Sequence, residues 1–66
     1  MRVALEKKWI DQLVRLPESG MGDQRVDVCF VDGRWARDVV VLNAEEADLP
    51  DDLVRLPIRE ITPHKG

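Results

Sequence analysis

The stretch from Gln24 to Leu42 constrains the fold more than any other part of the chain. It holds two runs rich in β-branched and aromatic residues, which meet at Asp32-Gly33. An Asp-Gly pair between two such runs is a strong signal for a β-hairpin. We therefore predict a hairpin over residues 24–42. Because a two-stranded hairpin alone is only marginally stable in water, the rest of the chain is expected to cover it.

The first predicted strand has a clear inward face. Side chains alternate between the two faces of a strand, so three apolar residues of this strand share one face and are expected to form the core. They are Val26, Val28 and Phe30.

The register of the hairpin is open. A two-residue turn at Asp32-Gly33 sets Asp27 opposite Asp38, which is unfavourable because the charges are alike. A three-residue turn over 31–33, with Gly33 left-handed, sets Asp27 opposite Arg37 instead. The sequence does not decide between the two registers.

The second predicted strand ends in a continuous apolar run, Val39, Val40, Val41 and Leu42. Such a run indicates burial on both faces. One face can meet a helix, but a chain of this length offers little to cover the other. We expect this strand and Trp35 to bind a protein partner, with a homodimer as the favoured form.

Residues 3–16 carry apolar side chains at helical spacing, and Pro17 ends the pattern. The polar face mixes acidic with basic side chains, which favours packing on the sheet over lying on a membrane. We predict an amphipathic helix over 3–16. Its apolar residues are Leu5, Trp9, Ile10, Leu13, Val14 and Leu16.

Two shorter elements follow the hairpin. Asn43 has the spacing of a helix N-cap with Glu46 three residues later, which predicts a helical turn over 44–48. Pro57 and Pro63 bracket a last strand over 57–62, and proline suits an edge strand. The predicted fold is a single α+β domain over 1–66. In it an N-terminal amphipathic helix packs on a small antiparallel sheet of about three strands, the hairpin plus a C-terminal edge strand.

Composition limits the classes of function. A chain of 66 residues with a net charge of −3 and a pI near 5.0 lacks the basic surface of a DNA-coating protein. The one cysteine cannot form an internal disulfide, and no apolar run is long enough to span a bilayer. With no secretory signal pattern at its start, the chain is expected to be cytoplasmic.

The residues that could carry catalysis are few. Ser19, Cys29, Thr62 and His64 are each the only residue of their type. A buried strand cysteine and a histidine near the chain end make a poor nucleophile and base, and they are too few for a zinc site. We therefore expect no enzyme activity, no cofactor and no metal. The glycine-bearing loop over 17–23 follows a helix, whereas phosphate loops precede one, and whether it binds a ligand stays open.

Two alternatives to self-association remain. In the first, Arg25, Arg34 and Arg37 form a basic strip on the hairpin and Trp35 stacks on a base of a nucleic acid or on an anionic ligand. In the second, an acidic patch binds a basic site on a larger protein. The patch consists of Glu45, Glu46, Asp48, Asp51 and Asp52.

Two resemblances follow from these motifs. The order of a helix, V-x-V-x-F-x-D-G-R at residues 26–34 and a valine-rich strand resembles the opening of Sm-like and other SH3-like small barrels. Such barrels often bind RNA or peptides, but the resemblance covers about half of the chain and serves as a fold analogy that carries no function. The motifs Ser19-Gly20-Met21-Gly22, Val26-Asp27-Val28, Asp32-Gly33-Arg34 and Asn43-Ala44-Glu45 are together similar to short bacterial proteins of no assigned function.

Overall fold

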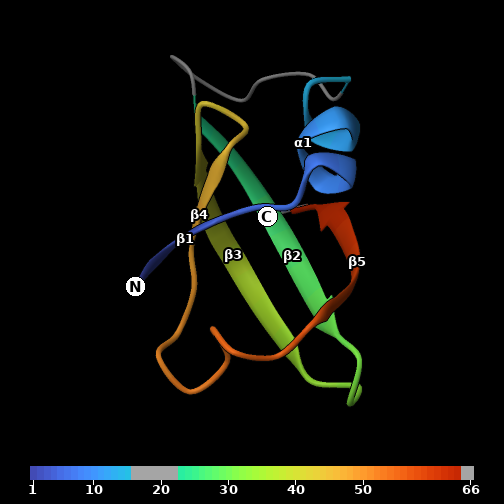
Figure 1. The fold of residues 1–66 in the computed structure, drawn as a ribbon, viewed down its shortest axis with the longest axis vertical. Coiled ribbons are helices and arrows are strands. Elements are labelled where there is room, and N and C mark those ends of the chain that lie inside the picture. The colour runs from blue at the N-terminus through green and yellow to red at the C-terminus, as the bar shows by residue number, and fades with distance from the viewer. Residues whose placement is uncertain (16–22, 65–66) are drawn as a thin grey trace.

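The computed structural model describes residues 1–15 and 23–64. Within these residues one helix accompanies five strands, which form a single antiparallel sheet (Figure 1). Along the sheet the strands lie in the order β1-β4-β3-β2-β5. The elements are β1 (Arg2–Ala4), α1 (Lys7–Leu13), β2 (Asp23–Phe30), β3 (Trp35–Leu42), β4 (Glu46–Asp48) and β5 (Ile58–Pro63).

The helix-plus-sheet composition agrees with the prediction, but the sheet has five strands and not about three. The helix begins at Lys7, because residues 2–4, partly predicted as helical, pair with β4 as strand β1. The predicted helical turn over 44–48 is also wrong. Asn43 (φ 53) and Ala44 (φ 58) are left-handed, so the chain reverses there and enters β4. The first error concerns a strand whose partner is distant in sequence, and the second concerns a left-handed turn that joins β4 to the adjacent β3.

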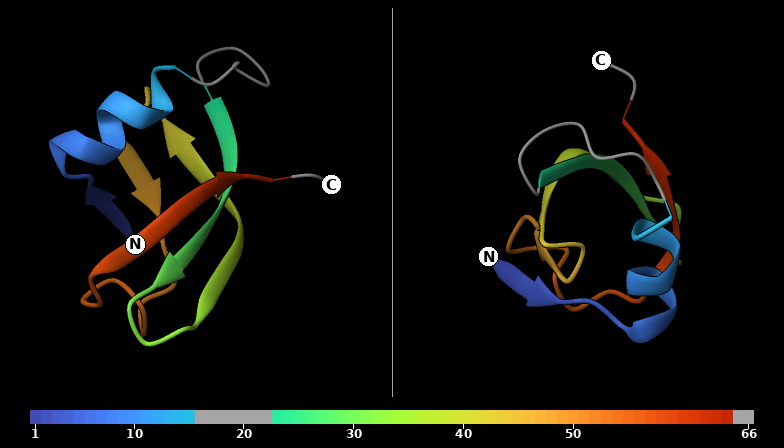
Figure 2. Two further views of the ribbon diagram at one scale, coloured as in Figure 1. Left: turned by 90° about the vertical axis from the view of Figure 1, so that its right-hand side faces the viewer. Right: turned by 90° about the horizontal axis from the view of Figure 1, so that it is seen from above.

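The sheet curls around a core, and α1 lies across one end of it (Figure 2). Val26, Val28 and Phe30 are buried, as predicted from their alternation along the strand. From the helix, Trp9 and Leu13 join the same cluster. The curled sheet and the helix therefore enclose one core together.

The valine-rich run of β3 is better covered than the sequence indicated. Val39 and Val41 are 4% and 0% exposed and belong to the core, whereas Val40 and Leu42 are half-buried. The expectation that only a single helix would cover this run is wrong, since β2 and β4 flank β3 and the sheet curls over its inner face. The predicted interaction surface of the run is thus reduced to Val40 and Leu42.

The hairpin turn follows the three-residue alternative. The N–H of Phe30 donates to the carbonyl of Arg34 at 2.9 Å, and Gly33 between them has φ 92. This φ favours glycine because it has no Cβ. Cys29 consequently lies opposite Trp35.

A β-bulge then shifts the register by one residue. Between Val26 and Val28 the pairing changes, and Asp38 on the opposite strand has φ 55. Beyond the bulge Val26 lies opposite Val39, the register that a two-residue turn would have produced. Each of the two open registers therefore holds on one side of the bulge.

Candidate interaction surfaces

The outer face of the hairpin contains a buried carboxylate, Asp27, which is 8% exposed. It accepts hydrogen bonds from the backbone N–H of Asp38 at 3.0 Å and from Nη1 of Arg37 at 3.2 Å. Nδ1 of His64 lies 2.8 Å from Oδ1 of Asp27, the same oxygen that accepts from Asp38, whereas Arg37 contacts Oδ2. The N–H of Asp38, followed by His64 and Arg37, lowers the pKa of Asp27 below the ordinary aspartate value. The cluster ties β2, the bulge of β3 and the residue after β5 together.

The arginines of the predicted nucleic-acid strip are all on this outer surface, and each has an aspartate partner. Paired arginines offer less charge to a phosphate backbone, because the neighbouring carboxylate neutralises them. The three pairs are Arg25 with Asp38 at 2.8 Å, Arg34 with Asp32 at 2.6 Å and Arg37 with Asp27 at 3.2 Å. Hydrogen bonds from Arg34 also lower the pKa of Asp32.

Trp35 is the aromatic residue of this surface, and it is 37% exposed. The guanidinium carbon of Arg37 lies 4.4 Å from the centroid of its ring, within the range of a cation–π contact. Since Arg37 also contacts Asp27, the ring, the guanidinium and the carboxylate form one connected group.

Cys29 and His64, the only conceivable catalytic pair, have other partners. Cys29 is fully buried and its Sγ lies 3.3 Å from Nη2 of Arg59, while the His64 ring contacts Asp27. No hydrogen bond within residues 1–15 and 23–64 joins the two. The same residues contain no group of three or more side chains placed to hold a metal ion.

The acidic patch is exposed throughout, yet part of it is engaged. The amino group of Met1 donates to Asp48 at 3.0 Å and to the carbonyl of Leu49 at 2.8 Å, and it lies 3.5 Å from Asp51. The hydrogen bond to Asp48 raises the pKa of this amine. Glu45, Glu46 and Asp52 form no ion pair with any described residue.

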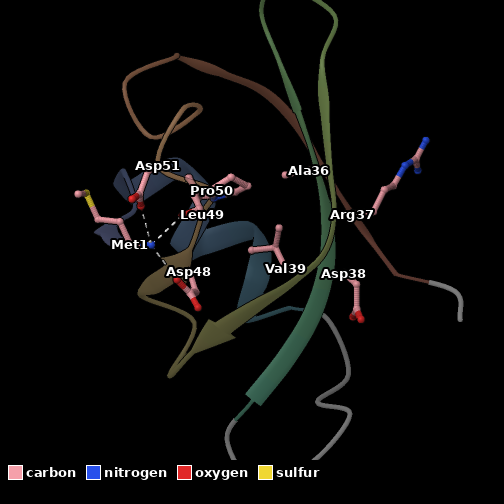
Figure 3. Close-up of a pocket in the computed structure, with 9 residues that line it drawn as sticks. All are labelled: Met1, Ala36, Arg37, Asp38, Val39, Asp48, Leu49, Pro50 and Asp51. Carbon is pink, nitrogen blue, oxygen red and sulfur yellow. Dashed lines mark hydrogen bonds and ion pairs between the residues drawn. The ribbon is translucent and has the colours of Figure 1, made fainter.

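A hollow of about 350 Å³ lies between β3 and this patch. Ala36 and Val39 point from β3 toward the segment that carries Leu49 and Pro50, whereas Arg37 and Asp38 point to the opposite side of the strand (Figure 3). The hollow thus has an apolar floor, and its rim is the engaged part of the acidic patch.

The outer edge of β1 is open. The N–H of Leu5 donates to the carbonyl of Glu45, and the N–H of Leu49 donates to the carbonyl of Met1, both at 2.9 Å. Because hydrogen-bonded and non-hydrogen-bonded positions alternate along an antiparallel pair, Arg2 and Ala4 are at non-hydrogen-bonded positions. The peptide groups of Arg2 and Ala4 therefore point away from β4. Within the described part of the chain no hydrogen bond reaches the N–H or C=O of either residue. We call these four groups the β1 edge.

A small apolar groove of about 140 Å³ runs beside the β1 edge. It separates β1 and the start of α1 from the segment that leads into β5. With one acidic exception, Glu6, its walls are apolar. The lining residues are Val3, Ala4, Leu5, Glu6, Trp9, Leu49, Val54, Leu56, Pro57 and Ile58.

The opposite edge of the sheet, at β5, is partly covered. The side-chain amide of Gln12 in α1 donates to the carbonyl of Ile61 at 2.7 Å. Pro63 lies at the end of the strand and has no N–H. At these two positions the β5 edge therefore lacks a free carbonyl and a free N–H.

The β1 edge was missed from the sequence because Val3 and Leu5 also fit the helical spacing of the residues that follow. Three residues are too few for strand alternation to be recognised. The predicted loop motif Ser19-Gly20-Met21-Gly22 lies outside the described residues, so the structure does not bear on it.

Comparison with family models, with curated proteins and with solved structures finds no match to this chain. The resemblances drawn from the hairpin and loop motifs accordingly stay predictions. In the described residues no helix has the length and apolarity needed to cross a lipid bilayer.

Proposed function

We propose that this chain is a non-catalytic protein-interaction module that self-associates. The observation that supports it best is the β1 edge, where Arg2 and Ala4 leave their backbone donors and acceptors unpaired by other described residues. An open strand edge favours pairing with a further strand, because backbone hydrogen bonds then extend the sheet.

The outward-facing part of the interaction surface predicted from the sequence lies on the same face of the sheet as the side chain of Ala4. Leu42 is opposite Glu46, and Glu46 is opposite Ala4 on its other side, so the three side chains form one row across β3, β4 and β1. Leu42 is half-buried, and so is Val40 on the same face. Val40 and Leu42 supply apolar surface near a contact centred on the edge, whereas Trp35 lies at the other end of β3, next to the hairpin turn.

Binding to nucleic acid is the weaker proposal. The exposed Trp35 with its stacked Arg37 favours it, since aromatic rings stack on bases. The ion pairs of Arg25, Arg34 and Arg37 count against it. We propose a cytoplasmic location from composition alone.

Sedimentation equilibrium across the micromolar range tests the main proposal. Self-association through backbone and apolar contacts should persist when salt is raised, whereas binding of a labelled single-stranded oligonucleotide should weaken steeply. A chain that stays monomeric at every concentration and salt would contradict the proposal. A monomer that binds the oligonucleotide only at low salt would support the alternative.

A further inference from the structure

We infer that the partner of the β1 edge is a second copy of the same strand, paired antiparallel around a two-fold axis. This inference rests on the proposed self-association and assigns the surface that carries it. It would join two five-stranded sheets into one continuous sheet across the pair of molecules.

The positions of the free backbone groups determine the register. Only Arg2 and Ala4 direct their peptide groups outward. In an antiparallel pair of identical strands, all of these groups are bonded only when Arg2 lies opposite the partner's Ala4 and Ala4 opposite the partner's Arg2. Val3 then faces the partner's Val3 across the axis. A two-fold contact of this kind is self-complementary and closed.

Charge complementarity supports this register. Ala4 lies opposite Glu46 in the sheet, so Arg2 in the proposed dimer has the partner's Ala4 beside it and the partner's Glu46 one strand further. The two charged residues are two strand spacings apart, about 9.6 Å, and only a methyl side chain stands between them. Neither Arg2 nor Glu46 forms an ion pair with another described residue. The symmetry of the dimer creates this proximity of opposite charges twice.

The apolar groove lies on the side where the partner's Val3 would project. Val3 faces inward and lines the groove with Leu56 and Ile58, all of them half-buried. In the proposed pairing the two Val3 side chains are direct neighbours at a position without hydrogen bonds, where side chains approach closely. The dimer would therefore cover apolar surface as well as satisfy backbone groups.

Pairing of β1 with the β5 edge of another copy is disfavoured. The carbonyl of Ile61 already accepts a hydrogen bond from Gln12, and Pro63 has no N–H to donate. A head-to-tail chain of molecules would have to break the first contact. The two-fold pair breaks none of the described hydrogen bonds.

Two sets of variants test the inference by sedimentation equilibrium, with circular dichroism as the check on folding. Ala4→Pro removes an N–H that only the dimer uses, twice per dimer, and should raise the dissociation constant roughly thirtyfold. Arg2→Glu and Glu46→Arg should each weaken the dimer, and Arg2→Glu combined with Glu46→Arg should restore it. Arg15→Glu, in the turn just after α1, makes the same charge change as Arg2→Glu and should leave the dimer unchanged.

The outcomes separate the inference from the proposed function. Weakening by each single charge variant and recovery in the combined one supports the β1 pair, even if Ala4→Pro fails to fold. A dimer that none of these variants weakens overturns the β1 pair and leaves self-association standing through another surface. A wild-type chain that remains monomeric overturns both.

Discussion

The two edge strands of the sheet, β5 and β1, differ in how their outward backbone groups are covered. At β5 the helix supplies Gln12 to the carbonyl of Ile61, and Pro63 removes a donor. At β1 no described residue forms a hydrogen bond with the backbone groups that point outward from Arg2 and Ala4. An edge strand can be kept from pairing by being covered or by being short, and β1 is short, with three residues, but its outward groups are uncovered. The difference indicates that α1 both closes the core and covers the β5 edge. The β1 edge is left available to a partner.

The largest loss of stability is expected when the buried helix residue Leu13 is shortened. Leu13 is fully buried in the core, so Leu13→Ala should reduce the free energy of unfolding by about 2–5 kcal/mol. The β5 edge should become exposed together with the core. Chemical denaturation measures the loss, and hydrogen exchange at Thr62, whose N–H faces β2, should quicken more than exchange at Val41. Equal quickening at both residues would contradict a role of α1 in covering this edge.

A smaller effect is expected at Asp27, which holds the chain just after β5 through His64. Asp27→Asn should lower the stability at neutral pH by about 2 kcal/mol, because charged hydrogen bonds to Arg37 and His64 are lost. The pKa of Asp27 is depressed, so its contribution is complete above the ordinary aspartate value of 3.8 and declines as the pH falls below it.

The difference between wild type and Asp27→Asn should therefore shrink as the pH is lowered below about 4. Denaturation curves at a series of pH values measure it. Asp11→Asn, at an exposed helical position without a described ion pair, is the control and should cost little. A difference that stays constant down to the lowest pH would show that the charge of Asp27 does not stabilise the fold.

A smaller loss of stability is expected when the hydrogen bond from Gln12 to Ile61, which covers the β5 edge, is removed. Gln12→Ala removes the donor to Ile61, and we expect a loss of about 1 kcal/mol because the site is only partly buried. The variant would make the β5 edge resemble the β1 edge, so an increased tendency to form larger assemblies should accompany the loss. Asp11→Ala serves as the neighbouring control. Unchanged stability and assembly would mean that Gln12 is not an effective cover.

The smallest effect is expected for Ala4→Pro in the isolated monomer. Its N–H points away from β4, so proline removes no internal hydrogen bond and the stability should change by no more than about 0.5 kcal/mol. Val3→Pro is the matched comparison, because Val3 is bonded to Ala47 and its N–H would be lost from the sheet. Both variants are compared at a protein concentration too low for the dimer to form. Equal losses of unfolding free energy in the two would contradict the alternation of hydrogen-bonded positions derived for β1.

The hairpin could be predicted because its signals are local. The Asp32-Gly33 pair and the alternation of Val26, Val28 and Phe30 act within a few residues of one another. The inward face and one of the two turn alternatives are accordingly confirmed. The register remained open since the bulge at Asp38 combines both alternatives, and no alternation pattern indicates a single extra residue.

The two short strands could not be predicted, because β1 needs a distant partner and β4 follows an uncommon turn. Arg2–Ala4 is a strand only through its pairing with β4, and β4 is reached through Ala44, an alanine in the left-handed region. That backbone conformation is uncommon outside glycine and asparagine, so Asn43 and Glu46 indicated a helix cap instead. The candidate site depends on β1 and was missed for the same reason.

The bulge at Asp38 separates the tip of the hairpin from the interior. Because the register is reset there, a connection longer or shorter by one residue could be absorbed at this position without turning Val39 and Val41 toward solvent. Substitutions at the exposed positions 31–35 can then accumulate, whereas Val28, Phe30 and Ala36 on the same side of the bulge stay in the core. The exposed end of the ribbon is thus free to diversify independently of what keeps the molecule folded.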